Sequence, residues 1–224
     1  MTTFTDVSNG AIPWKFNESV ATIFQAHALK HIPDYQKIID LSVQITLNIF
    51  WSWARVLDFG SALWYTIDKF SQAGIKSVYG IEKSEAMIQN SLFQERIILG
   101  DTIPNNTQLF DVIIANWTLH FIKDRIPTIH SFYQNLAEWG IIIITDKIAS
   151  SEYIHTLYLD FKRTNGLSEA EIKEKTESLK WVLFPYTLAY YLSLFRELWF
   201  DTDIINASPC FVTFCLKKVK TTSA

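Results

Sequence analysis

The stretch Arg55-Val56-Leu57-Asp58-Phe59-Gly60 decides the fold of this chain. It is a short apolar run that ends in an acidic residue and a glycine, and continuously apolar runs are typical of strands covered on both faces. Four further runs of this kind follow along the chain, at residues 77–82, 96–101, 110–116 and 139–146. Helical or mixed patterns separate them, at residues 64–74, 84–93 and 122–138. This alternation predicts an α/β fold with a mostly parallel sheet.

Helical segments flank this alternating core on both sides. Apolar residues at helical spacing predict helices over about 18–30, 34–50, 150–182 and 187–198. The first two are separated by His31-Ile32-Pro33, because a proline disfavours helical geometry in the residue before it. Ser168 and Glu171 have the spacing of a capping box, which predicts a helix start. Residues 204–205 and 210–216 are predicted as the closing strands.

The composition excludes several classes of protein. The chain has 224 residues, of which 49% are hydrophobic and 19% charged, so it is not a mainly disordered chain. Its formal net charge of -3 gives no electrostatic footprint for nucleic acid. The most apolar stretch, residues 41–57, is interrupted by Gln44, Asn48 and Arg55 and is too short for a membrane span. The polar start of the chain predicts no signal peptide.

The chain has two cysteines, Cys210 and Cys215. Their odd spacing places them on opposite faces of the predicted strand, so we expect no disulfide between them. The lack of a C-x-x-C pattern argues against a structural zinc site, and we expect no bound metal. Such cysteine usage predicts a reducing, cytoplasmic compartment.

Polar residues stand where the predicted strands end, which is where parallel sheets bind their ligands. They are Asp58, Glu82, Asp101 and Asn116. Glu82 follows Gly60 by roughly 20 residues, the offset at which an acidic side chain accepts hydrogen bonds from a ribose. The first loop holds a single glycine, Gly60, which argues against NAD or FAD. Taken alone, Gly60 has a second interpretation, in which it only turns a strand into a helix. The strand ends together predict a nucleoside site.

Six segments carry a family resemblance: residues 16–24, 32–35, 56–61, 116–121, 146–147 and 160–172. Their order and spacing resemble a class I S-adenosylmethionine-dependent methyltransferase. More narrowly, the chain resembles the carboxy-S-adenosylmethionine synthase family, whose members are often labelled tRNA wobble-uridine methyltransferases. The resemblance covers about residues 13–217. The segment DFKRTNGLSEAEI at 160–172 is the most specific, because ordinary methyltransferases lack it.

The resemblance implies a seven-stranded, Rossmann-like sheet and S-adenosyl-L-methionine as the cofactor, with carboxy-S-adenosyl-L-methionine as an alternative. It implies cofactor contacts at Tyr35, Asp58, Gly60, Ser61, Ala62, Glu82, Lys83, Asp101, Thr102 and Asn116. Asn116 and His120 are the predicted catalytic residues. The family is typically dimeric, so we expect a homodimer.

The same resemblance implies one domain with four parts. Residues 1–50 would form an N-terminal helical cap, and residues 51–149 the cofactor-binding core. Residues 150–200 would form a helical substrate or dimer region, and residues 201–224 the closing strands and tail.

The chain departs from the family pattern at two positions. Trp64 stands where a glycine usually ends the first loop, and its ring would either point outward or narrow the cofactor pocket. The synthases hold the extra carboxylate of their cofactor with an arginine of a C-terminal helix, and Leu194 aligns with that position. Arg196 lies two residues away and would face elsewhere on a helix. These departures favour ordinary S-adenosylmethionine as the cofactor.

Three functions stay open at this point. The favoured hypothesis is a methyltransferase whose acceptor is unknown, either tRNA or a small molecule. The second is a carboxy-S-adenosyl-L-methionine synthase that uses prephenate as carboxyl donor. The third is a degenerate, non-catalytic binding module, which Trp64 and the few glycines would explain.

Several side chains also have two interpretations. His120 is either a general base or a residue that only packs. His27 and His31 have the spacing of a metal pair but lack a visible third ligand. Three basic residues either meet an anionic substrate or form a solvated helix face: Lys147, Lys162 and Arg163. The aromatic residues between 153 and 191 would form a dimer seam mixed with pocket lining.

Overall fold

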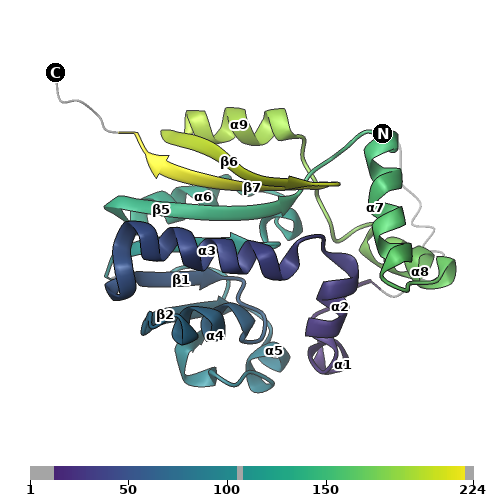
Figure 1. The fold of residues 1–224 in the computed structure, drawn as a ribbon, viewed down its shortest axis with the longest axis horizontal. Helices are drawn as coiled ribbons and strands as arrows, with labels where there is room; N and C mark the ends of the chain where they lie inside the picture. The colour runs from purple at the N-terminus through teal and green to yellow at the C-terminus, as the bar shows by residue number, and fades with distance from the viewer. Residues whose placement is uncertain (1–12, 105–107, 220–224) are drawn as a thin grey trace, which may run out of the picture.

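The computed structural model describes residues 13–104 and 108–219. Its centre is a seven-stranded sheet with the order β3-β2-β1-β4-β5-β7-β6 (Figure 1). The strands are β1 (Arg55–Phe59), β2 (Ser77–Glu82), β3 (Ile97–Leu99), β4 (Phe110–Asn116), β5 (Leu136–Lys147), β6 (Phe200–Ser208) and β7 (Phe211–Lys218). Strands β1 to β5 are parallel, and β7 is antiparallel to both β5 and β6. The predicted α/β fold with a mostly parallel, seven-stranded sheet is confirmed.

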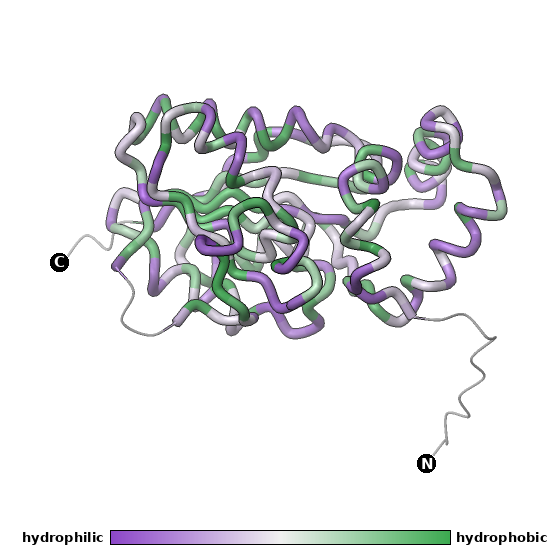
Figure 2. Tube along the Cα trace, turned by 90° about the horizontal axis from the view of Figure 1, so that it is seen from below, coloured by the Kyte–Doolittle hydropathy of each residue, from purple (hydrophilic) through white to green (hydrophobic). Residues whose placement is uncertain are grey.

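Helices cover both faces of this sheet. One face carries α3 (Tyr35–Phe50), α4 (Tyr65–Gln72) and α5 (Glu85–Gln89), and the other carries α6 (Ile126–Asn135) and α9 (Leu188–Glu197). Phe70 of α4 packs into one core, and Phe132 of α6 and Phe195 of α9 pack into the other. Figure 2 shows the hydrophobic residues gathered along the central strands. Because β4 and β5 are covered on both sides, their sequences are continuously apolar.

A further group of helices lies at the end of the sheet where the parallel strands finish (Figure 1). It consists of α1 (Glu18–Ala21), α2 (Phe24–His31), α7 (Glu152–Thr164) and α8 (Glu169–Leu179), and we call it the helical cover. The Tyr158 hydroxyl of α7 donates to the His31 carbonyl of α2 at 2.9 Å. The backbone N–H of Trp14 donates to the Ser178 carbonyl of α8, also at 2.9 Å. These bonds join the N-terminal segment to the helices that follow β5.

Some element boundaries differ from the predictions. The helix predicted over 18–30 is divided into α1 and α2. Strand β5 begins at Leu136, inside the helix predicted over 122–138, because Leu136 pairs with Phe110 of β4 before a bulge. The helix predicted over 150–182 is interrupted between α7 and α8. The capping box of Ser168 and Glu171 begins α8, as its spacing predicts.

Cys210 corrects another expectation. It lies with a φ of +64° in the two-residue turn between β6 and β7, so it does not share a strand with Cys215. The hairpin turn takes up the position that the apolar pattern assigned to a strand. Both cysteines are free and buried. Within residues 13–104 and 108–219, no helix has the length and apolar character that a membrane span requires.

Candidate functional site

A cavity of about 400 Å³ lies between the carboxyl ends of the parallel strands and the helical cover. Every residue that the sequence predicts for the site lines this cavity: Tyr35, Asp58, Gly60, Ser61, Ala62, Glu82, Lys83, Asp101, Thr102, Asn116 and His120. They come from α3 and from the ends of neighbouring strands, which the parallel order brings to one edge. The structure therefore brings the predicted set together, and the role of each residue stays a prediction.

Gly60 turns the chain at the end of β1 with a φ of +76°. A Cβ atom at this position would lie 2.4 Å from Oγ1 of Thr118. The Thr118 hydroxyl donates to the Phe59 carbonyl at 3.2 Å, so the loop after β4 is packed against the end of β1. Gly60 is thus required by its backbone conformation and by the close approach of Thr118.

Two buried carboxylates line the same part of the cavity. Glu82 accepts hydrogen bonds from the backbone N–H groups of Ala62 at 2.9 Å and Ser84 at 2.8 Å, which hold its side chain beside the first loop. Asp58 is 3% exposed, and burial raises its pKa to about 7, with the charge of Glu82 acting in the same direction. A cationic group of a ligand would stabilise the ionised form of Asp58.

Several buried polar atoms at these strand ends have no hydrogen-bond partner among the described residues. They are Oδ2 of Asp58, Oγ of Ser61, both amide atoms of Asn116 and Nε1 of Trp117. Buried polar groups in folded proteins nearly always have a partner, because an unpaired one costs about 1–3 kcal/mol. Since the set contains donors as well as acceptors, it suits a ligand that also carries both.

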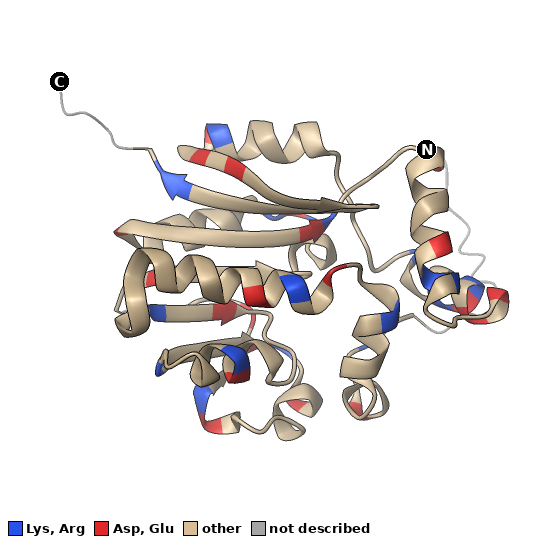
Figure 3. Ribbon diagram, in the orientation of Figure 1, with Lys and Arg blue, Asp and Glu red and all other residues tan. Residues whose placement is uncertain are grey.

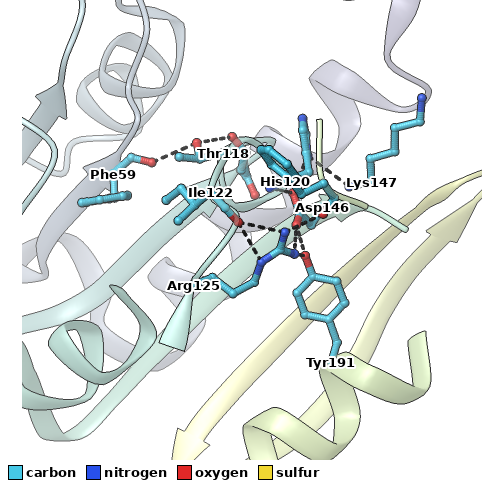
Figure 4. A network of polar contacts seen from close by, with 10 residues as sticks. Phe59, Thr118, His120, Ile122, Arg125, Asp146, Lys147 and Tyr191 are labelled. Atoms are coloured by element: carbon cyan, nitrogen blue, oxygen red, sulfur yellow. Dashed lines mark hydrogen bonds and ion pairs between the residues drawn. The ribbon is translucent and has the colours of Figure 1, made fainter. Parts of the chain in front are cut away.

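His120 lines the cavity and is held by Asp146, which lies near the end of β5 (Figure 4). Asp146 Oδ1 accepts a hydrogen bond from the backbone N–H of His120 at 3.0 Å and contacts Nδ1 of the imidazole ring. The backbone N–H of Lys147 also lies 3.3 Å from Nδ1, but the contact with Asp146 is closer. Because a carboxylate only accepts, the closer contact favours the proton on Nδ1 and leaves Nε2 as an acceptor. A ring oriented in this way can act as a general base.

Asp146 also belongs to a buried ion pair with Arg125 (Figure 4). Both side chains are fully buried, and Nη1 of Arg125 lies 3.5 Å from Oδ2 of Asp146. The Tyr191 hydroxyl of α9 donates to Asp146 and accepts from Arg125. Arg125 also donates to the Phe184 carbonyl at 2.6 Å, in the segment before α9. Burial and the Asp146 carboxylate raise the pKa of Tyr191, so its hydroxyl stays protonated. This network fixes the orientation of Asp146.

Tyr35 forms an aromatic wall of the cavity. Its ring centroid lies 4.6 Å from the ring of Trp117 and 5.9 Å from the ring of Tyr65. Trp117 has a φ of +56°, and its backbone N–H donates to the Thr145 carbonyl at 2.6 Å. This bond holds the turn that follows Asn116 at the end of β4.

Trp64 and Leu194, the two residues that depart from the family pattern, lie away from the cavity. Trp64 is half-buried beside Tyr65 and lines a separate small hollow, so its ring does not fill the cavity. Leu194 packs into the apolar core under α9 with 5% exposure. Arg196 is exposed and lines another surface hollow with Asp201. No arginine is among the described residues that line the cavity.

Basic residues of the helical cover reach the cavity, and for Lys162 and Arg163 the structure decides between an anionic substrate contact and a solvated helix face. Lys162 is 3% exposed and lines the cavity, so the solvated interpretation is wrong for this residue. Arg163, the next residue, points outward and bonds Asp160 and Glu169. Lys175 also lines the cavity, but no motif in the sequence identifies it as a site residue. Lysines on two successive helices share no local motif.

His27 and His31 form a ring pair, with centroids 4.0 Å apart. In the part of the chain that the structure describes, no group of three or more His, Cys, Asp or Glu side chains could hold a metal ion. Of the aromatic residues between 153 and 191, Tyr158 lines the cavity, whereas Tyr153 and Trp181 are 74% and 79% exposed. The expected homodimer stays a prediction.

Comparison with known proteins gives consistent results. A family model described as a methyltransferase domain matches residues 57–144. The carboxy-S-adenosyl-L-methionine synthase of Wolinella succinogenes is 30% identical over 224 residues, which cover 92% of this chain and 93% of that protein. A putative S-adenosyl-L-methionine-dependent methyltransferase from Methanococcus maripaludis has a TM-score of 0.65 at 15% identity, with full coverage of both chains. The plantazolicin methyltransferase BpumL, solved with SAH, also has a TM-score of 0.65, at 14% identity and 89% coverage of this chain and 90% of its own.

Proposed function

The chain belongs to the carboxy-S-adenosyl-L-methionine synthase family, and on that premise we propose that it transfers the methyl group of S-adenosyl-L-methionine to an acceptor in the cavity. Its class, a transferase that uses S-adenosyl-L-methionine, follows from the family and from the methyltransferase domain that it contains. The unpartnered polar atoms at the strand ends carry the proposal.

The residues present fit this cofactor. Glu82 would accept hydrogen bonds from the ribose hydroxyls, and Asp101 with Thr102 would meet the adenine edge. Asp58, with its raised pKa, would gain from the cationic amino group of the methionine moiety. These assignments cover the ribose, the adenine and the amino group of the cofactor. The half-buried Trp64 presents no obstacle, because it lies outside the cavity lining.

When bound, the cofactor supplies an electrophilic methyl group on sulfur. The protein then has to orient the acceptor, exclude water and, for a protonated nucleophile, remove a proton. Nε2 of His120 is the acceptor atom available for that proton, and Asp146 stabilises the resulting positive charge on the ring. Asn116 has two unpaired amide atoms in the same cavity and would position the reacting groups.

Calorimetric titration with S-adenosyl-L-methionine and with S-adenosylhomocysteine tests the proposal. We expect wild-type protein to bind both, and Glu82→Ala to weaken both by about 30-fold, which corresponds to roughly 2 kcal/mol for charge-assisted hydrogen bonds. Glu85→Ala on the exposed side of α5 is the matched control and should leave both affinities unchanged. Unchanged affinity of the Glu82 variant would show that the cofactor binds elsewhere.

A carboxy-S-adenosyl-L-methionine synthase is the second candidate, and family membership favours it. Leu194 in the apolar core and the outward-facing Arg196 do not supply the carboxylate contact that the family resemblance implies. Incubation with S-adenosyl-L-methionine and prephenate, followed by mass analysis, separates the two candidates. A gain in cofactor mass equal to one carboxyl group would establish the synthase, and an unchanged cofactor would exclude it.

A further inference from the structure

Three lysines from separate elements line the cavity under the helical cover. Lys147 ends β5, Lys162 lies on α7 and Lys175 lies on α8. Nζ of Lys147 lies 4.6 Å from the ring centroid of Tyr158, and Nζ of Lys162 lies 4.5 Å from the same centroid. Two ammonium groups therefore share one aromatic ring. Figure 3 shows basic positions close together where α7 meets α8.

These lysines have no acidic partner. Among the described residues, no carboxylate lies within 4.0 Å of their ammonium groups. The acidic residues of the cavity lining are Asp58, Glu82 and Asp101, which stand at the ends of β1, β2 and β3. The lysines instead come from β5 and the helical cover. Apart from Lys83, which follows Glu82 at the strand ends, the basic residues of the cavity thus lie apart from its acidic residues.

The buried position of the lysines is unfavourable for their charged forms. Burial, together with the charges of neighbouring lysines, lowers the pKa of Lys162 to about 8 and that of Lys175 to about 6. Burial also lowers the pKa of Lys147. The histidines that face this region, His27 and His31, have pKa values lowered to about 4 and about 3, so they are neutral at pH 7. An anion placed among the lysines would stabilise their charged forms.

A further unpartnered atom faces the same space. His31 lines the cavity with 7% exposure, and its Nδ1 has no hydrogen-bond partner among the described residues. Around it, the cavity walls are aromatic and apolar, with Trp14 stacked on His27 at 5.1 Å and Tyr158 against Phe211 at 5.6 Å. Such walls suit the flat or apolar body of a small molecule.

We propose that Lys147, Lys162 and Lys175 form an anion-binding subsite that holds a carboxylate or phosphate group of the methyl acceptor. The acceptor is then a small molecule with an acidic group at one end and an apolar body against Trp14 and Tyr158. This inference rests on the proposed function, since the acceptor must lie beside the cofactor. The two parts of the cavity then bind different molecules. The cofactor lies at the acidic strand ends, and the acceptor lies at the lysines.

Anion binding tests the subsite without knowledge of the acceptor. Melting temperatures are measured with inorganic phosphate and, separately, with benzoate, at constant ionic strength set by sodium chloride. At ten times the dissociation constant, we expect the wild-type melting temperature to rise by about 3–5 °C. A rise with phosphate alone identifies a phosphate subsite, and a rise with benzoate alone identifies a carboxylate subsite. No rise with either anion would overturn the proposal.

Lys162→Met and Lys175→Met remove one amino group each and keep most of the length of the unbranched side chain. We expect each to weaken anion binding about tenfold or more, as loss of a charge-assisted contact predicts. We also expect each variant to melt above the wild-type protein without anion, because folding no longer has to bury or deprotonate an amino group whose pKa is lowered in the folded chain. Lys173→Met, at an exposed position of α8, is the control and should change neither property. Equal anion binding by the Lys162 and Lys173 variants would refute the subsite.

Titration of the same variants with the cofactor distinguishes the source of the anion. If the lysines serve the acceptor, the Lys162 and Lys175 variants bind S-adenosyl-L-methionine as the wild-type protein does. A tenfold loss of cofactor affinity in these variants would instead assign the lysines to the cofactor carboxylate and overturn the acceptor assignment. Failure of the wild-type protein to bind the cofactor at all would refute the proposed function, whereas the anion titration would still test the subsite.

Discussion

Replacement of Asp146 by asparagine should damage the protein in two measurable ways. In the structure, Asp146 accepts from the backbone and ring of His120, from the Tyr191 hydroxyl and from Arg125. An amide has one accepting oxygen in place of two, and its NH₂ group would face donors. Arg125, which is fully buried, would lose its ionic partner.

The structure sets the expected magnitude. Removing one partner of a buried ion pair costs about 3–5 kcal/mol, because it leaves an uncompensated buried charge. For a chain of this size, each kcal/mol lowers the melting temperature by about 2–4 °C. We therefore expect Asp146→Asn to melt about 6–20 °C below the wild-type protein. At the cavity, the ring of His120 would compete with Arg125 and Tyr191 for the one remaining acceptor oxygen, so its proton would no longer be held on Nδ1 alone.

Two measurements check this expectation. Calorimetric or fluorescence melting gives the loss of stability. Asp160→Asn is the control, because Asp160 makes an exposed ion pair with Arg163, and exposed pairs contribute little to stability. Nitrogen chemical shifts of the His120 ring give its tautomer. We expect Nδ1–H in the wild-type protein and a mixture of tautomers in the variant. If Asp146→Asn melts within about 3 °C of the wild-type protein, as the control should, or keeps a single Nδ1–H tautomer, the network does not act as described.

Two further predictions follow from the backbone and from the lysines. Gly60→Ala should lower the free energy of unfolding by about 2–5 kcal/mol, the sum of left-handed backbone strain and overlap with Thr118. Gly74→Ala should lower it by only about 1–2 kcal/mol, because the φ of Gly74 is also positive but no atom lies within 4 Å of the added Cβ. Urea unfolding measures both, and equal losses would contradict the role of Thr118. The free energy of unfolding without ligand should rise between pH 7.5 and pH 9.5. Lys162 and Lys175 have pKa values of about 8 and about 6 in the folded chain, against an ordinary 10.5 in the unfolded chain. The folded chain therefore binds fewer protons than the unfolded chain in this range, so a higher pH favours folding. Lys175→Met should flatten this rise and Lys173→Met should preserve it; an equal rise in both would refute the assignment.

The strand ends of the core could be predicted from the sequence because a local pattern carries them. Each apolar run ends in a polar residue, and in a parallel sheet every such end reaches the same edge. The sequence therefore predicts that Asp58, Glu82 and Asn116 lie close together, and all three line the cavity. The boundaries of helices and strands are harder to predict where pairing with a strand distant in the sequence decides them. Leu136 is one example, since its pairing with Phe110 extends β5 into a segment of helical pattern.

The partners of His120 could not be predicted in the same way. Arg125 precedes α6, Asp146 ends β5 and Tyr191 lies on α9, so no spacing in the sequence links them. Only the packing of α6 and α9 on one face of the sheet brings the three together. Lys162 and Lys175 are similar, because their side chains converge only when α7 and α8 fold over the strand ends. A basic residue on a polar helix gives no sign of which face will be covered.

The distribution of charge in the cavity bears on how methyl transfer would proceed there. Transfer from a sulfonium cation to a nucleophile disperses or removes the positive charge on sulfur, so fixed charges nearby affect the reaction strongly in a dry cavity. Under the proposal, Asp58 and Glu82 would stabilise a cation at the strand ends, and the lysines would stabilise an anion under the helical cover. An acceptor with an acidic group is therefore bound with that group away from Asp58, which directs its other end toward the cofactor. Neutralising the lysines would leave cofactor binding intact. It would weaken the binding of the acceptor and also leave the acceptor less well oriented toward the cofactor. The charge pattern would thus select the acceptor. Part of this pattern comes from Lys162, which lies in the family-specific segment 160–172.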